Sequence, residues 1–494
     1  MKKMRTLARY FLQVIFLIIV KSLTAQDYRA INGSPYAGSL AAANNPASIV
    51  HVPFAWDITP LAFQFKQLTN AINLSKVSYV SKWKNAVVNS NNGTFERFLM
   101  ANQDLRLLNA RIRLNCNSAI AFGASARSYF SAKTTALNWQ DSLGPLREFM
   151  GINLNNTPMS GQARANIWTE VFGTYARTIM VYDDAILNAG ITVKLNTGIA
   201  GGYMNAIRFE EAPGTVNNQP GYYLTNGKLD YGYSSNVDVL DTATSFGNAK
   251  KDFFKNTNSS VAISLGAEYI VSGSGEEENG YSLKIGVSLL DLGMNRFQYS
   301  DYSRSAVLNK KNVSDTLIGT SFGNTDGPAS FADTLQSLAG SIKTFTGKFR
   351  LFQPARLVIN ADKHITDNFF INADLTLPLL YVLGNKQLFV RDMNFISLTP
   401  RYETKTFGIY LPVSLSTQMN FWVGGAVKTG PFLLGFHNLA NLLIKNKVQN
   451  GGAYLAFTFR FKGKNQTCSD TDNVKGQSIS NKKTRQFSCP GPVQ

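Results

Sequence analysis

The chain has 494 residues and a formal net charge of +18, from 49 basic and 31 acidic residues. This charge does not indicate nucleic-acid binding, because no basic helix or finger motif accompanies it and an export signal precedes the rest of the chain. His51, His364 and His437 are the three histidines. None has a metal-ligand partner at i+4 or a Gly-x-Ser-x-Gly companion, so we expect no metal site, no cofactor and no enzymatic activity.

Residues 1–25 are predicted to be a signal peptide. Basic residues precede the apolar stretch Phe11–Val20, and the small residue Ala25 marks the expected cleavage point. The alternative is a membrane anchor, but the stretch is shorter than the roughly 20 residues that a spanning helix needs. No Cys follows the cut, which argues against a lipid anchor. Since no later apolar run is long enough for a spanning helix, any membrane embedding must use strands.

Residues 26–52 do not resemble a wall strand. They contain Ala-Ala-Ala-Asn-Asn-Pro-Ala-Ser at 41–48, which is small and turn-prone. Because this segment precedes the first expected strand, we predict that it folds into the lumen of a barrel as a plug. Asn44, Asn45 and Pro46 are the candidate plug residues.

Residues 53–462 show a recurring two-residue alternation, which is typical of strands with one apolar and one polar face. In the clearest case, Leu455, Phe457, Phe459 and Phe461 occupy every second position. The expected strands are Trp56–Lys66, Leu108–Asn115, Ala119–Phe130, Arg164–Met180, Leu187–Tyr203, Val261–Ile270, Tyr281–Leu290, Arg350–Lys363, Phe369–Leu380, Ile396–Tyr402, Phe407–Ser416, Phe421–Lys428, Pro431–His437 and Ala453–Lys462.

The connections between these strands alternate in length. Those near 116–118, 183–185, 272–280, 365–368, 403–406 and 429–430 are short, whereas those near 67–105, 131–162, 207–257 and 302–346 are long and polar. Bacterial outer-membrane barrels have short periplasmic turns, long external loops and an even strand number. The pattern therefore predicts an all-β transmembrane antiparallel barrel of about 14 strands in the outer membrane, with both termini periplasmic. A secreted all-β protein is the alternative.

If the apolar face meets lipid, the charged residues of the strands must face the lumen, because a charge on the lipid face costs roughly 2–4 kcal/mol. The predicted lumen-lining residues are Arg111, Arg113, Arg127, Lys194, Glu268, Lys284, Arg356, Asp362, Asp374, Arg401, Glu403 and Arg460. The excess of cations among them could favour anionic or amphipathic solutes. Alternatively, these charges pair across the lumen and simply fill it, which is the interpretation that we favour.

Residues 463–494 are polar and basic, and are predicted to form a periplasmic tail. This tail contains Cys468 and Cys489, which could pair in the oxidising periplasm and would then leave Cys116 as the odd cysteine.

Several stretches resemble known families. Asn-Asn-Pro-Ala-Ser at 44–48 is similar to the Asn-Pro-Ala motif of FadL-like outer-membrane barrels. The chain also resembles, over nearly its whole mature length, an uncharacterised domain-of-unknown-function family of Bacteroidota outer-membrane proteins. The stretches that carry this second resemblance are Arg113–Ser118, Gly190–Lys194 with Gly198, Ser288–Gly293, Leu398–Glu403 and Thr429–Gly435.

The FadL-like resemblance implies a 14-stranded barrel with an N-terminal segment inside it and, in transporters, a route for hydrophobic compounds. Some FadL-like relatives instead act as partners in type IX secretion or gliding. Two features depart from the pattern: Cys116, where Pro or Gly would be expected, and the cysteine-bearing tail.

The leading functional hypothesis is passive transport or binding of small apolar or amphipathic molecules, with residues 26–52 as a gate. The alternative is a non-transporting scaffold whose loops or tail bind envelope, periplasmic or secretion-system proteins. The expected surroundings are outer-membrane lipid and lipopolysaccharide, with a small hydrophobic solute as the candidate ligand and no nucleic acid.

Overall fold

The structure is a computed structural model that describes residues 28–461, except 82, 142, 217, 240–252, 255–256, 274–280, 380–386 and 445. The predicted signal peptide and tail, with Cys468 and Cys489, lie outside these residues.

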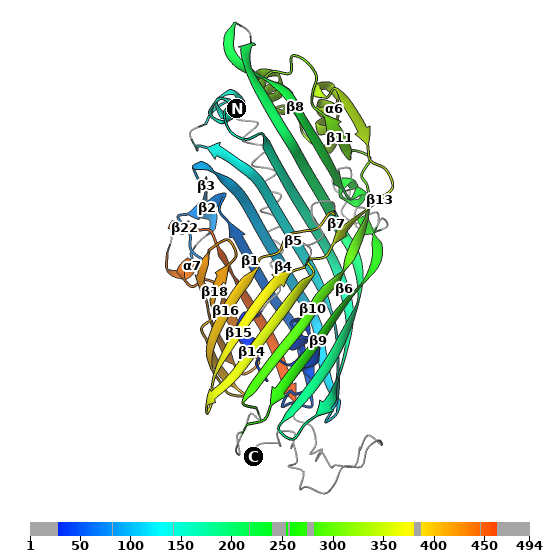
Figure 1. Ribbon diagram of the computed structural model, residues 1–494, viewed down its shortest axis with the longest axis vertical. Helices are drawn as coiled ribbons and strands as arrows, with labels where there is room; N and C mark the ends of the chain where they lie inside the picture. Colours follow the sequence, from blue (N-terminus) through cyan, green and yellow to red (C-terminus); the bar gives the residue numbers. More distant parts are fainter. Residues whose placement is uncertain are drawn as a thin grey trace.

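The chain folds into a closed antiparallel β-barrel with a 14-strand wall (Figure 1). Closure occurs at β1 (Trp56–Thr69), which pairs with β4 (Gly93–Asn115) on one side and β23 (Gly451–Phe461) on the other. The wall continues from β4 through β5 (Ser118–Trp139), β6 (Met159–Val181), β7 (Ala185–Val216), β9 (Asn258–Val271), β10 (Leu283–Gln298), β14 (Arg356–Thr366), β15 (Phe369–Pro378) and β16 (Phe395–Glu403). It is completed by β17 (Phe407–Tyr410) with β18 (Val413–Ser416), β19 (Phe421–Val423) with β20 (Gly425–Thr429), and β21 (Phe432–Phe436). The predicted all-β barrel of about 14 strands is confirmed.

Three details of the predicted wall were wrong. The expected strand Arg350–Lys363 is broken at Pro354 into β13 (Lys348–Phe352) and β14, because proline lacks the N–H that a central strand position needs. The segment 67–105 is not all loop, since β4 already begins at Gly93. The segment 207–257 is not all loop either: β7 extends to Val216 and turns back into β8 (Gln219–Tyr233).

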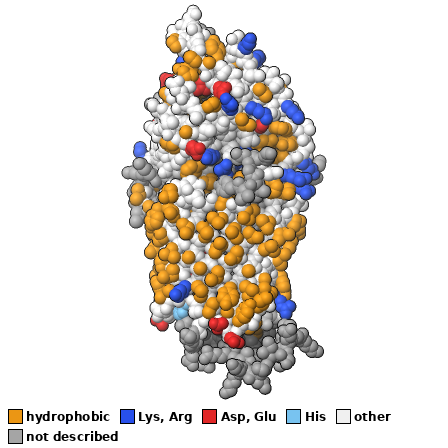
Figure 2. All heavy atoms as spheres, viewed as in Figure 1, with side chains coloured by type: hydrophobic (Ala, Val, Ile, Leu, Met, Phe, Trp, Pro, Cys, Tyr) orange, Lys and Arg blue, Asp and Glu red, His pale blue; other side chains and the backbone are white. Residues whose placement is uncertain are grey.

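Apolar side chains gather over the lower half of the visible face of the barrel, in what we call the apolar belt (Figure 2). On β23, Phe457, Phe459 and Phe461 are 36–46% exposed, whereas the alternate residue Thr458 is 2% exposed. This is the lipid-facing surface that two-residue alternation produces in outer-membrane barrels. No helix among the described residues is long and apolar enough to cross a membrane.

The two ends of the barrel differ. At the short-turn end, hairpins join β4 to β5, β6 to β7 and β14 to β15, and the pair Trp56–Phe461 closes the wall beside Ile112. At the long-loop end, the wall continues upward into a layer above the belt (Figure 1). This layer contains β8, β11 (Arg304–Val307), β12 (Ser341–Thr344), β13, α2 (Leu146–Asn153), α5 (Asp315–Phe322) and α6 (Pro328–Leu338). A small sheet of β2 (Ile72–Ser75), β3 (Val87–Ser90) and β22 (Asn446–Val448) lies near α7 (Ala440–Leu443).

Local sequence explains how the helices of the upper layer begin. The Ser314 side chain accepts a hydrogen bond from the backbone N–H of Leu317 and so caps the first turn of α5. Pro328 opens α6 at a position where its missing N–H costs nothing. These caps position the apolar faces of α5 and α6 against β8 and β11.

Candidate functional site

The segment 28–52 is folded against the inner face of the barrel wall. It forms three short turns of 3-10 helix, η1 (Arg29–Ile31), η2 (Gly38–Ala43) and η3 (Pro46–Ile49). Ala30, Ala47 and Ile49 are completely buried. The turns contact strands on several sides of the barrel, from β1 and β4–β7 to β9 and β16, and the segment is visible in dark blue behind the lower strands (Figure 1). We call the described residues 28–52 the N-terminal segment.

Asn45 and Pro46, two of the predicted plug residues, fix the turn η3. The Asn45 Oδ1 accepts a hydrogen bond from the backbone N–H of Ala47 at 2.9 Å, so Asn45 caps the turn that Pro46 opens. The Asn45 Nδ2 also donates to the carbonyl oxygen of Ala267 in β9 at 2.9 Å. The third predicted residue, Asn44, accepts a hydrogen bond on its carbonyl from the Ser288 hydroxyl of β10 at 2.6 Å.

Three glycines of the wall make room for this turn. Gly190 in β7 lies opposite Gly266 in β9, and Gly286 lies on the next strand, β10. A Cβ at Gly190 would lie 2.5 Å from the backbone carbon of Pro46, and a Cβ at Gly266 would lie 2.1 Å from the Asn45 Oδ1. We call Gly190, Gly266 and Gly286 the glycine bed. The sequence analysis did not predict it, although an isolated glycine in a strand is a signal for close backbone approach.

The N-terminal segment is also bonded to predicted lumen-lining residues. The Asn32 Nδ2 donates to Asp374 at 2.6 Å, the Ser34 hydroxyl to Glu403 at 2.7 Å, and the Ser48 hydroxyl to Glu268 at 2.7 Å. Lys284 donates to the carbonyl of Gly33, and Arg460 to the carbonyl of Tyr36. The wall charges therefore hold the segment, rather than lining an open passage at this level.

A second group of buried charges crosses the lumen. Arg127 forms two hydrogen bonds of 2.8 Å with the Asp291 carboxylate and a 3.3 Å ion pair with Glu170. Lys194 bonds Asp291 at 2.6 Å, and Arg356 lies 3.9 Å from the same carboxylate. These five residues, from β5, β6, β7, β10 and β14, form what we call the central ion network.

The other predicted lumen-lining residues pair near the N-terminal segment or lie at the short-turn end. Arg401 bonds Asp362 at 2.6 and 2.8 Å and Glu403 at 3.1 Å. Arg111 bonds Asp57 at 2.9 Å, and Arg113 is half-buried. Ten of the twelve predicted residues are buried; Arg113 and Arg460 are the two that are half-buried.

Several buried acids were missing from the sequence-based set, and four of them pair with predicted cations. These four are Asp57, Glu170, Asp291 and Asp392. Buried cations were missed as well, among them Lys66, Arg106 and Lys428. Lys428 bonds Glu403 at 2.8 Å, so the lumen holds more ion pairs than the predicted set contained. Asp291 was missed because it lies at a β-bulge with a positive φ of 59°, where strict alternation fails.

Residues 387–394, between β15 and β16, fold inward at the long-loop end, which sequence reasoning also missed. Asp392 pairs with Arg356 at 3.5 Å and accepts a hydrogen bond from the Asn102 side chain. Val390 packs against Tyr129 and Trp168. We call this stretch the inner loop. The lumen thus contains three layers, which are the N-terminal segment, the central ion network and the inner loop.

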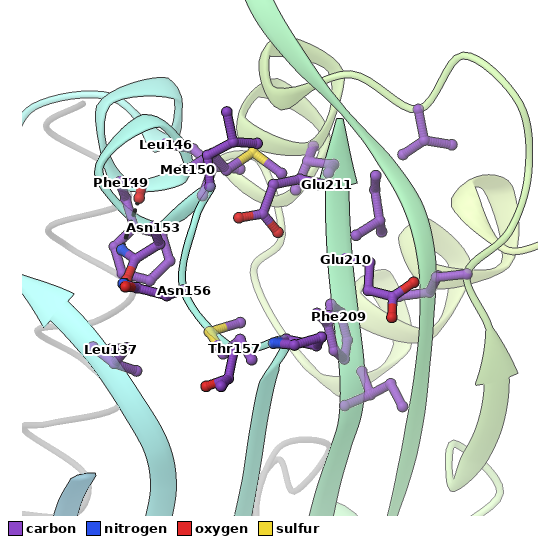
Figure 3. Close-up of a pocket in the computed structure, with 18 of the residues that line it drawn as sticks. Leu137, Leu146, Phe149, Met150, Asn153, Asn156, Thr157, Phe209, Glu210 and Glu211 are labelled. Carbon is purple, nitrogen blue, oxygen red and sulfur yellow. Dashed lines mark hydrogen bonds between the residues drawn. The ribbon is translucent and has the colours of Figure 1, made fainter. Parts of the chain in front are cut away.

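An apolar pocket lies in the layer above the belt (Figure 3). Its volume is about 310 Å³, whereas the cavities around the N-terminal segment hold about 10 Å³, roughly the space of one water molecule. The pocket lies between α2, α5, α6 and the strands β5, β6, β7 and β8. Its apolar lining includes Leu137, Phe149, Met150, Phe209, Ile318 and Leu335. Its size and apolar lining suit a small ligand.

Cys116, which the sequence analysis leaves as the odd cysteine, is disulfide-bonded. The predicted pairing of Cys468 with Cys489 falls outside the described residues.

Comparisons with known proteins give a family without an assigned activity. The model of a family of unknown function (DUF5723) matches residues 46–437, in agreement with the resemblance to an uncharacterised family. A search of curated proteins found no match.

Solved structures similar to this chain include a FadL homologue and two toluene transporters. A Pseudomonas aeruginosa FadL homologue has 11% identity and a TM-score of 0.41, over 89% of this chain and 98% of that one. The Ralstonia pickettii toluene transporter TbuX has the same identity and TM-score, over 88% and 100%. The P. putida toluene transporter TodX has 9% identity and a TM-score of 0.37, over 87% and 95%.

Proposed function

This chain belongs to the DUF5723 family of unknown function, and we propose that it is an outer-membrane barrel that binds small apolar or amphipathic molecules and passes them through its lumen. The observation that carries this proposal is the apolar pocket of about 310 Å³, which lies above a barrel whose lumen contains the N-terminal segment, the central ion network and the inner loop. A pocket of this size, lined by side chains from seven helices and strands, has the dimensions of a preformed ligand site.

The proposed orientation places the apolar belt in the outer membrane and the short-turn end in the periplasm, as in other bacterial barrels. The chain that follows the N-terminal segment meets β23 at this end, where the Ala55 N–H donates to the Phe461 carbonyl oxygen. In this proposal both termini are periplasmic. The pocket then faces the exterior, where lipopolysaccharide surrounds the long loops, and it would be the first site that an incoming molecule meets.

Passage from the pocket requires the three inner layers to rearrange. The N-terminal segment is held by hydrogen bonds to Asp374, Glu403 and Glu268, and charge-assisted bonds of this kind are the stronger ones in proteins. A gate held in this way stays closed at rest and opens only when a ligand or a partner displaces it. In this proposal the N-terminal segment is the movable layer, because it is tied to the wall by side chains rather than by a strand ladder.

Single-channel conductance of the refolded protein in planar bilayers tests this proposal. Three variants are compared with the intact chain: one lacks residues 27–50, one lacks 387–391, and one lacks both. Heat-modifiable migration on gels serves as the control for correct barrel folding. Channels that open on either deletion, or only on both, support a gated transporter.

The second candidate function is a scaffold that does not transport. The specific observation in its favour is the central ion network, which fills the lumen with paired charges of opposite sign. Correctly folded barrels that remain silent in all three deletion variants would favour this function. A pull-down through residues 463–494 that recovers a periplasmic or secretion-system protein would then identify its partner.

A further inference from the structure

The charges of the apolar pocket have one sign. Among its described lining residues, the ionisable ones are Glu210 and Glu211, both on the part of β7 that extends above the belt. No Lys or Arg belongs to this lining. The pocket therefore presents two carboxylates within an otherwise apolar lining.

The two glutamates differ in how they are neutralised. Glu210 is paired with Arg208, whose Nε lies 2.6 Å from the Glu210 Oε1. Among the described residues, Glu211 has no ion pair and no side-chain hydrogen bond to another residue, and it extends from β7 toward α2 (Figure 3). Of the polar groups on that side, Asn153 is already engaged with the backbone N–H and carbonyl of Asn138, at 2.7 and 3.0 Å.

Burial in this apolar setting raises the pKa of Glu211 above its ordinary value, while a hydrogen bond from its own backbone N–H opposes the shift. The carboxylate is therefore a group whose charged form lacks a counter-ion. A cation that arrives with a bound ligand would relieve this cost, whereas an anion would add to it.

We propose that the pocket selects amphipathic molecules with a cationic amine headgroup, with Glu211 as the counter-ion and the apolar lining around the hydrocarbon chain. This inference rests on the proposed function, because it presupposes that the pocket binds small amphipathic molecules. It adds a preference: an amine is bound more tightly than an alcohol of the same length, and a carboxylate more weakly.

The test compares three probes of equal length, octylammonium, octanol and octanoate, on the full chain in nanodiscs of neutral lipid. Trp139 provides the readout, since its ring lies 5.9 Å from that of the pocket residue Phe149, and Trp139→Phe defines the background fluorescence. We expect octylammonium to bind about 10-fold more tightly than octanol, the usual scale of a charge-assisted bond. Glu211→Gln should remove this advantage and leave octanol binding unchanged.

Glu210→Gln is the matched control, because that carboxylate already has a partner in Arg208 and its loss should change the preference less. Lipid partitioning of the probes cancels between the parent protein and the variants. If octanol and octylammonium both fail to bind, the proposed function of the pocket fails. If octanol binds but octanoate binds as tightly as octylammonium, or Glu211→Gln changes nothing, only the headgroup inference is overturned.

Discussion

Arg127 and Asp291 form a two-pronged ion pair in the lumen, with both nitrogen-to-oxygen distances at 2.8 Å and neither side chain more than 1% exposed. The pair depends on a backbone irregularity. Asp291 has a positive φ of 59° at a bulge in β10, where this strand changes its partner from β14 to β13. The bulge turns the Asp291 carboxylate toward Arg127, Lys194 and Arg356, three cations from three other strands.

Asp291→Asn should destabilise the barrel strongly. Asparagine has the same shape and tolerates a positive φ, so the change removes the charge and leaves the bulge intact. Breaking a buried ion pair on one side leaves uncompensated cations and costs about 3–5 kcal/mol. The measurement is urea-induced unfolding of the refolded protein, followed by heat-modifiable migration on gels.

Arg208→Ala is the control for this prediction. The ion pair between Arg208 and Glu210 is exposed, with 70% of the Arg208 side chain accessible. Exposed ion pairs contribute about 0–1 kcal/mol to the free energy of unfolding. Equal losses of stability in the two variants would contradict a structural role for the central ion network.

Gly266→Val should displace the N-terminal segment from its position against the wall glycines. A Cβ at Gly266 would lie 2.1 Å from the Asn45 Oδ1 and 3.0 Å from the Pro46 nitrogen, so the turn η3 cannot remain in place. Arg29 is the one tryptic site within residues 28–52, and the following residue, Ala30, is completely buried. We expect trypsin to cleave after Arg29 in this variant at a rate well above that of the intact chain, as mass spectrometry would detect.

Gly173→Val is the matched control for the glycine bed. Gly173 also lies in a wall strand, β6, but a Cβ there meets nothing within 4 Å. Protection of Arg29 in Gly266→Val, or cleavage at the same rate in both variants, would show that the bed does not hold the N-terminal segment.

The sequence predicted the wall of the barrel well, because lipid enforces a strict two-residue pattern on every strand that crosses the belt. Phe457 and Phe459 face outward and Thr458 inward, as the alternation predicted. The lumen was predicted less completely, since its contacts depend on where the pattern breaks. Asp291 lies at a bulge and Asp392 on the inner loop, and periodicity carries no information at either position. The pocket draws its lining from α2, α5, α6 and four strands, a convergence that only the tertiary structure brings about.

Ala136→Phe should block the pocket. Ala136 in β5 is one of its lining residues, and a phenyl ring there would occupy much of the volume of about 310 Å³. We expect octanol binding to weaken by at least about 10-fold, in line with the ~1.5–3 kcal/mol that burying an apolar side chain of that size represents. The measurement is the Trp139 fluorescence titration, with unchanged unfolding in urea as the control. Undiminished octanol binding would place the ligand elsewhere.

Binding of octylammonium should strengthen as the pH rises through the raised pKa of Glu211. Below that pKa the carboxyl is protonated and offers no counter-ion; above it the carboxylate is charged and attracts the ammonium group. Burial is the main cause of the raised pKa. The rise in octylammonium affinity should therefore occur at a pH above the ordinary pKa of a glutamate, which is about 4.3. The other charged groups nearby are already paired: Glu210 with Arg208, and Arg147 of α2 with Asp315 of α5 at 2.8 Å. Fluorescence titrations at several pH values should therefore give a rising affinity in the parent protein, a flat one in Glu211→Gln, and no trend with octanol. A pH profile that persists in Glu211→Gln would assign the titrating group to another residue.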